Sequence, residues 1–225
     1  MNFLAHLYLA DDTPASRVGN LMPDLVRGRL PADLPAEVME GVRRHRRIDA
    51  FTDTHPLFAR SRDRLRPRHG RFAGILVDIF YDHLLAADWA SWHPRTLPAF
   101  SAEVYDSFAG AGHLMPERMR RIVERIADQD RLGSYARVSG IEDVLVRMSR
   151  RLTERFRRPV HLERAMDELR AHRDELAGDF AGFFPQLIAY AHPARQRPCR
   201  SARCGTSANE QAGPIPGAAL RSAPA

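Results

Sequence analysis

The chain has 225 residues, of which 44% are hydrophobic, so it can form a folded domain with a substantial core, and this excludes a wholly disordered protein. No run of residues approaches the roughly eighteen apolar residues of a membrane span, so we expect no membrane partner. The N-terminus lacks a secretory signal, and two cysteines are too few for a disulfide scaffold, so we expect a cytoplasmic protein. The formal net charge is +6, but residues 192–225 hold five arginines against one acidic residue, so most of this charge lies in that segment and we expect no nucleic-acid partner.

Apolar residues recur at helical spacing through most of the chain, and alternating runs of β-branched residues are missing. This pattern predicts an all-α fold with a single helical domain over residues 1–191. The predicted helices cover residues 1–10, 15–27, 35–54, 56–66, 71–87, 97–109, 116–130, 139–155 and 160–190. From residue 192 the composition turns to Pro, Gly, Ala, Ser and Arg without an amphipathic period, so residues 192–225 are predicted to form a disordered C-terminal tail.

The first two predicted helices carry isolated polar groups. His6 stands among apolar residues in MNFLAHLYLA, where a lone histidine is more often a core residue than a ligand. Asn20 and Asp24 are four residues apart in GNLMPDLVRG, and Pro23 is expected to kink or start a helix just before Asp24. Each of these signals is weak by itself.

In the predicted helix 35–54, the apolar stripe continues as His45 and Asp49. The two are four residues apart and therefore share one face, where they could bind one ion, hold each other by a hydrogen bond or form a simple surface pair. Arg43, Arg44, Arg46 and Arg47 surround them. A charge run usually marks a solvated face, but this one flanks acids that are predicted to point inward.

The segment FAGILVDIFYDHLLAA, residues 72–87, is apolar nearly all round, which predicts a buried helix. It nevertheless carries Asp78 and Asp82 on one face, followed by His83. Two neighbouring buried carboxylates repel each other, so a cation must face them. That cation is either an arginine of a neighbouring helix or a metal ion, and this segment does not decide between the two.

Four predicted helices are thus expected to direct a histidine or an aspartate toward a shared interior. Imidazole and carboxylate ligands suit Mn²⁺, Fe²⁺, Mg²⁺ or Zn²⁺, and the absence of thiolate argues against a structural zinc site. Such a site beside arginines is what metal-assisted phosphoester hydrolysis needs, because the metal activates water and the arginines offset phosphoryl charge.

The same segments resemble the bacterial acyl carrier protein phosphodiesterase family, also called ACP hydrolase. The matching blocks, spread over roughly residues 1–190, are NFLAHLYLA (2–10), GNLMPDLVRG (19–28), HRRIDAFTD (45–53), DIFYDHLLAADW (78–89) and FFPQ (183–186). The resemblance implies a divergent relative of the all-helical HD-domain phosphohydrolases, although the His-Asp dipeptide of that superfamily is reversed here as Asp82-His83.

The resemblance also implies an activity and a partner. Family members cleave the phosphodiester that joins 4′-phosphopantetheine to a serine of holo-acyl carrier protein, and they depend on manganese; Mg²⁺ and Fe²⁺ are the alternatives. The metal ligands are expected among Asp24, His45, Asp78, Asp82 and His83. The catalytic candidates are His6, Asp24, Asp49, Arg46 and Arg47.

Two other functions stay open. One is an HD-like phosphohydrolase that acts on a nucleotide or another small phosphoester. The other is a non-catalytic helical binding module whose buried acids and arginines are purely structural.

Overall fold

The computed structural model describes residues 1–26 and 28–192, and the regular elements in this part of the chain are all helices. The α-helices are α1 (Phe3–Tyr8), α2 (Pro14–Leu25), α3 (Ala36–Thr54), α4 (Pro56–His69), α5 (Ala73–Ala87), α6 (Leu97–Gly110), α7 (Glu117–Asp128), α8 (Arg131–Ser134), α9 (Val138–Phe156), α10 (Met166–Ala171) and α11 (Arg173–Ala191). Short 3-10 helices are η1 (Gly70–Phe72), η2 (Trp89–Ser91), η3 (Gly112–Leu114) and η4 (Leu162–Ala165). The all-α prediction is confirmed. Residues 193–225, which carry nearly all of the predicted tail, lie outside the described part.

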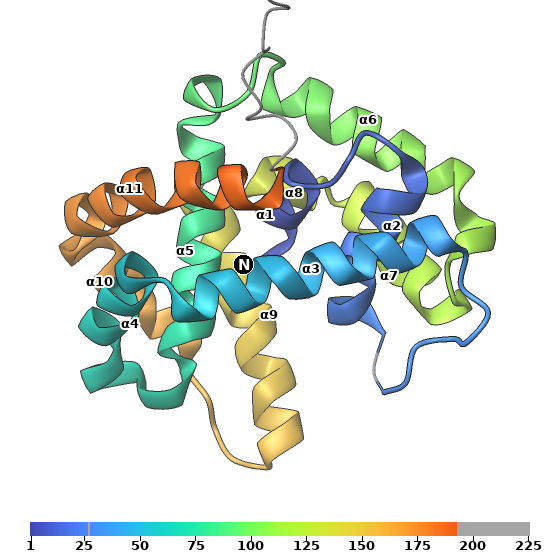
Figure 1. The fold of residues 1–225 in the computed structure, drawn as a ribbon. Coiled ribbons are helices and arrows are strands. Elements are labelled where there is room, and N and C mark those ends of the chain that lie inside the picture. Colours follow the sequence, from blue (N-terminus) through green and yellow to red (C-terminus); the bar gives the residue numbers. More distant parts are fainter. Residues whose placement is uncertain (27, 193–225) are drawn as a thin grey trace, which may run out of the picture.

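Helix α5 lies at the centre of the bundle, as expected for a helix that is apolar on nearly every side. Helices α1, α4, α9 and α11 pack against it, and Phe80 and Tyr81 are fully buried. In Figure 1, α3 passes in front of α5, and the N-terminus of the chain lies near this crossing. Within the described residues, none of the helices has both the length and the apolar character that a membrane crossing requires.

Helices α2 and α3 form the most extensive helix pair, and they approach so closely that only glycine fits at the contact. A Cβ atom at Gly19 would lie 2.1 Å from the carbonyl oxygen of Val38, and one at Gly41 would lie 2.7 Å from the carbonyl oxygen of Ser16. Both oxygens belong to the backbone and cannot rotate away. The contact therefore fixes the position of α2 relative to α3, and with it the groups that the two helices present to each other.

The C-terminal segment differs from the prediction of one helix over residues 160–190. Three elements follow one another there instead, η4, α10 and α11. The break between α10 and α11 lies at His172, whose φ of −113° and ψ of 21° leave the helical region. Neither glycine nor proline marks this position, so the local sequence carries no sign of the break.

Two local features also differ from expectation. Helix α8 lies in a stretch predicted as a connection; it starts after Asp130, whose φ of 40° is left-handed and whose side chain accepts a hydrogen bond from the Gly133 N–H. Helix α2 continues through Pro23 to Leu25, so this proline lies inside the last turn and does not start a helix.

Candidate metal centre

His6 of α1 and His45 and Asp49 of α3 form a group that could hold a metal ion. One ligand atom from each residue lies within 4.8 Å of the others. The two histidines are buried, whereas the Asp49 side chain is 38% exposed, so the group is accessible from one side. Nitrogen and carboxylate ligands without a thiolate suit Mn²⁺, Fe²⁺ or Mg²⁺ better than a structural zinc ion.

Hydrogen bonds on both sides fix the orientation of the His45 ring. Its Nδ1 lies 2.7 Å from the carbonyl oxygen of Asn20 in α2, and its Nε2 lies 3.0 Å from Asp49 Oδ2. Burial lowers the pKa of His45, but the hydrogen bond and the charge of Asp49 outweigh burial and raise it above its ordinary value. Because Nδ1 donates to a carbonyl oxygen, Nε2 is the nitrogen that can lose its proton and bind a metal.

His6 is buried between Asp49 and the ring of His45. Its Nε2 lies 3.2 Å from Asp49 Oδ1, and its buried Nδ1 has no hydrogen-bond partner among the described residues. The ring stacks on His45 with the centroids 4.1 Å apart, and burial lowers the pKa of His6 to about 4, so it is neutral at pH 7. A neutral imidazole offers the lone pair of one ring nitrogen, and a cation beside Asp49 would take up that lone pair at Nε2. The donor set therefore fits a metal ion.

Asp49 and Asp78 lie on either side of a positive charge. The α-ammonium group of Met1 is 3.3 Å from Asp49 Oδ1 and 3.1 Å from Asp78 Oδ1. Burial raises the pKa of Asp49, but His45, His6 and the ammonium group lower it well below its usual value. Burial opposes the charge of the ammonium group too, yet Asp78 and Asp49 raise the pKa of this amine to about 10. Asp78 thus joins the group through the ammonium and not through an ion pair with either histidine.

Asp24 lies at the edge of the group. Its Oδ1 is 3.8 Å from His45 Nε2, and its side chain is 33% exposed. Burial raises the pKa of Asp24 to about 6, so its carboxyl group can gain and lose a proton near neutral pH. Pro23 does not start a helix there, but α2 still directs Asp24 toward His45 across the glycine contact.

The structure does not bring Asp82 or His83 into this group. The Asp82 oxygens accept hydrogen bonds from the backbone N–H groups of Leu4, at 2.8 Å, and Ala5, at 3.0 Å. Burial raises the pKa of Asp82 to about 7 even with these two bonds. Asp82 therefore anchors the first turn of α1, the helix that carries His6. His83 Nδ1 lies 2.8 Å from the carbonyl oxygen of Tyr135, on the side of α8.

Three of the four arginines of α3 lie on its exposed face, away from the group. Arg43 and Arg47 both pair with Glu40 on the exposed face of the helix, at 2.8 and 3.2 Å, and Arg46 is exposed. These three arginines thus form a solvated face, whereas Arg44 is only 11% exposed and pairs with Asp11 Oδ2 at 2.7 Å.

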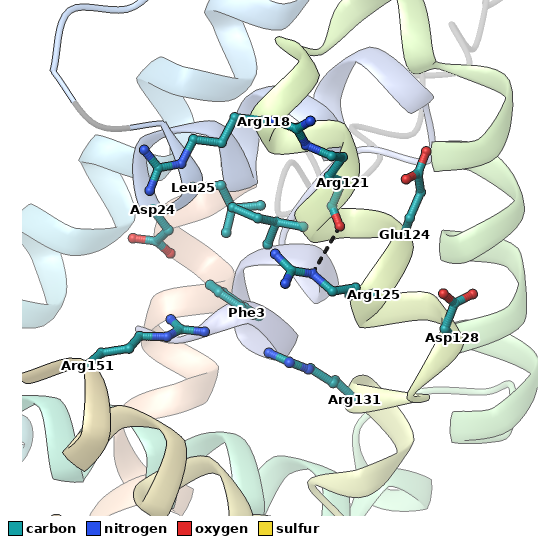
Figure 2. Close-up of a pocket in the computed structure, with 11 residues that line it drawn as sticks. Phe3, Asp24, Leu25, Arg118, Arg121, Glu124, Arg125, Asp128, Arg131 and Arg151 are labelled. Atoms are coloured by element: carbon teal, nitrogen blue, oxygen red, sulfur yellow. Dashed lines mark hydrogen bonds between the residues drawn. The ribbon is translucent and has the colours of Figure 1, made fainter.

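A different set of arginines lines the pocket that opens next to Asp24. This pocket has a volume of about 880 Å³. Its basic side chains are Arg118, Arg121 and Arg125 of α7, Arg131 of α8 and Arg151 of α9. Figure 2 shows Arg118 and Arg151 on either side of Asp24, with Arg125 and Arg131 pointing toward Phe3. Sequence reasoning missed these residues, although three of them recur at spacings of three and four along α7 and therefore share a helix face.

Comparison with known proteins decides the family. The family model described as acyl carrier protein phosphodiesterase matches residues 1–187. This chain belongs to that family. A relative named acyl carrier protein phosphodiesterase in Photorhabdus laumondii is 35% identical over 192 residues, which cover 85% of this chain and 95% of the relative. Proteins of the same name in Klebsiella pneumoniae and an Enterobacter species are 34% and 33% identical, each over 85% of this chain and 97% of the relative.

No solved structure matches the fold of this chain. The likeness to HD-domain phosphohydrolases therefore stays a prediction, and the site has to be interpreted from its own geometry.

Proposed function

We propose that this protein hydrolyses the phosphodiester between 4′-phosphopantetheine and the serine of holo-acyl carrier protein, with a divalent metal ion held by His6, His45 and Asp49. The observation that carries the proposal is the buried pair of stacked histidines with Asp49, whose carboxylate oxygens lie 3.2 Å from His6 Nε2 and 3.0 Å from His45 Nε2. Membership of the phosphodiesterase family supports the reaction type. Acyl carrier protein is the substrate that the names of the relatives give.

His6 Nε2, His45 Nε2 and Asp49 are the atoms and group that would hold the ion. When bound, a divalent cation lowers the pKa of water and offsets negative charge on the phosphate oxygens. Mn²⁺ is the first candidate, with Mg²⁺ and Fe²⁺ as alternatives, because all three accept mixed imidazole and carboxylate ligands.

The side chains of this protein contribute position and proton transfer. The Asn20 carbonyl oxygen holds His45 with Nε2 directed at Asp49, and Asp82 holds α1 so that His6 lies over His45. In the reaction a water oxygen bonds to phosphorus while the bond from phosphorus to the carrier serine oxygen breaks. That serine oxygen must take up a proton, and Asp24 is our candidate donor because its pKa is raised to about 6 at the edge of the pocket.

The test is conversion of holo- to apo-carrier, followed by gel mobility, with metal content measured on the same protein. We expect turnover that chelation abolishes and Mn²⁺ restores. His45→Ala should abolish metal binding and lower the rate of hydrolysis more than about 100-fold. Loss of a residue that only orients a metal ligand already lowers metal affinity or activity roughly 10–100-fold, so loss of the ligand itself should cost more. His113→Ala is the matched control, because His113 is exposed on η3.

Three results would contradict the proposal. Full turnover after exhaustive chelation would remove the metal from the mechanism. Wild-type metal affinity in His45→Ala would remove the proposed ligand set. Unchanged holo-carrier alongside hydrolysis of a small phosphoester would assign another substrate to the same centre.

A further inference from the structure

The pocket beside Asp24 gathers positive charge without a matching set of carboxylates. Arg118, Arg125, Arg131 and Arg151 line it, and within residues 1–26 and 28–192 none of them has a carboxylate within ion-pair distance. Glu124 and Asp128 also line the pocket, but they pair with none of these arginines. Arg121 differs, because it is bound to Glu117 at 2.9 Å.

These guanidinium groups are close enough to repel each other. The pKa of Arg131 is lowered first by its burial and then by the charges of Arg147, Arg151 and Arg125. In Figure 2 the side chains of Arg125, Arg131 and Arg151, which come from three different helices, point into the same space around Phe3. Like charges that converge on one cavity destabilise the protein unless an anion offsets them.

The pocket also meets the candidate metal centre. Asp24 belongs to its wall, and Asp24 Oδ1 lies 3.8 Å from His45 Nε2. The volume of about 880 Å³ falls within the roughly 300–1,000 Å³ of small-molecule sites, so the pocket has room for an extended organic group as well as its anionic end.

We propose that Arg118, Arg125, Arg131 and Arg151 form a phosphate-binding subsite that holds the phosphate end of the substrate and of the phosphomonoester product. The proposal rests on the proposed function for the identity of the ester. Guanidinium groups suit the role because their planar array of N–H donors matches phosphate oxygens in pairs. Arg118 and Arg151 flank Asp24, so these two arginines would contact the phosphate of the ligand next to the candidate metal centre. Arg125 and Arg131 lie farther along the pocket and would attract the same phosphate from there.

The experiment measures ligand binding to the metal-free, full-length protein by isothermal titration calorimetry at low salt. The probes are 4′-phosphopantetheine, inorganic phosphate, and pantetheine, which lacks the phosphate. We expect the two phosphate-bearing probes to bind and pantetheine to bind at least tenfold more weakly than 4′-phosphopantetheine. Arg125→Gln/Arg151→Gln should weaken phosphate binding at least tenfold.

Arg120→Gln is the matched control, because it removes the same charge from α7 at a position outside the pocket. Its phosphate affinity should stay within twofold of wild type. The double variant should melt at or above the wild-type temperature, since neither arginine has an ion pair to lose. A double variant that unfolds would show that these arginines are structural and would overturn the proposal.

Binding without metal or carrier separates this inference from the proposed function. The wild-type protein could bind phosphate, and the double variant lose that binding, while neither hydrolyses holo-carrier. That result would support the phosphate-binding subsite and contradict the proposed reaction. Normal hydrolysis with wild-type KM and wild-type phosphate affinity in the double variant would retain the reaction and reject the subsite. Equal binding of pantetheine and 4′-phosphopantetheine would also reject it, because the phosphate would then contribute nothing.

Discussion

The glycine contact between α2 and α3 predicts that Gly19→Ala damages the candidate metal centre and the fold together. A Cβ atom at this position would lie 2.1 Å from the Val38 carbonyl oxygen, whereas ordinary contacts begin at 3.4 Å. The two helices would have to separate by about 1 Å. That displacement stretches the 2.7 Å contact between His45 Nδ1 and the Asn20 carbonyl oxygen beyond hydrogen-bonding range, because Asn20 follows Gly19 directly.

The expected loss of stability follows from three contributions. Overpacking costs about 1–3 kcal/mol, and the broken hydrogen bond costs about 1 kcal/mol. Alanine in place of glycine inside a helix returns about 1 kcal/mol. The free energy of unfolding should therefore fall by about 1–3 kcal/mol, which lowers Tm by about 2–12 °C for a chain of this size.

The measurements are thermal unfolding of the metal-free protein and Mn²⁺ binding by calorimetry. Metal affinity should fall about 10–100-fold, as is usual when a partner that orients a histidine ligand is lost. Gly178→Ala is the control: this glycine lies inside α11 with no atom within 4 Å of an added Cβ, so the substitution should stabilise by about 0.5–1 kcal/mol. A Gly19→Ala protein with the stability and metal affinity of the wild type would refute the reasoning.

Two further predictions concern buried carboxylates. In Asp82→Ala, the amides of Leu4 and Ala5 lose their hydrogen-bond acceptor. Hydrogen-exchange NMR should show these two amides exchanging at least about tenfold faster, while the amide of Phe80 keeps its protection. Equal losses of protection at all three amides would contradict a local role of Asp82 in anchoring α1. Asp179 is buried against Ser61, Arg60 and Arg64. Burial raises the pKa of Asp179, but the hydrogen bonds from these residues outweigh burial and lower it. The charged Asp179 therefore stabilises the fold above the unfolded pKa of about 3.9, and this stabilisation is lost as the pH falls through the lower folded pKa. Urea unfolding should show Asp179→Asn to be less stable by about 1–3 kcal/mol at pH 7, with the difference shrinking below pH 4; a difference that does not depend on pH would contradict this.

Periodicity predicted the helices well where a helix buries one stripe or is apolar all round. Predicted residues 35–54 and 71–87 correspond closely to α3 (Ala36–Thr54) and α5 (Ala73–Ala87). The break at His172 could not be predicted, because neither a glycine nor a proline marks it and the His172 side chain makes no capping hydrogen bond. The same limit applies to α8, whose start depends on a left-handed residue at Asp130.

The candidate site shows a similar division. Spacing on one helix placed His45 beside Asp49, because residues four apart share a face whatever the fold. It could not tell which neighbour Asp82 would face, since the partners of Asp82 are backbone amides of another helix. Residue spacing also could not predict that Arg131 and Arg151 lie beside the arginines of α7, because these three helices meet only in the folded chain.

Because it carries His6, helix α1 would link cation binding at the candidate metal centre to the order of the N-terminal segment. It has only six residues, too few to persist alone in water, so it is held by Asp82 at its first turn and by the packing of its buried side chains. A cation that contacts His6 binds only the molecules in which α1 is docked. Its apparent affinity therefore includes the free energy of docking, and by the same linkage the cation tightens α1 against the bundle. The apparent affinity for the metal can thus be tuned at positions that never touch it.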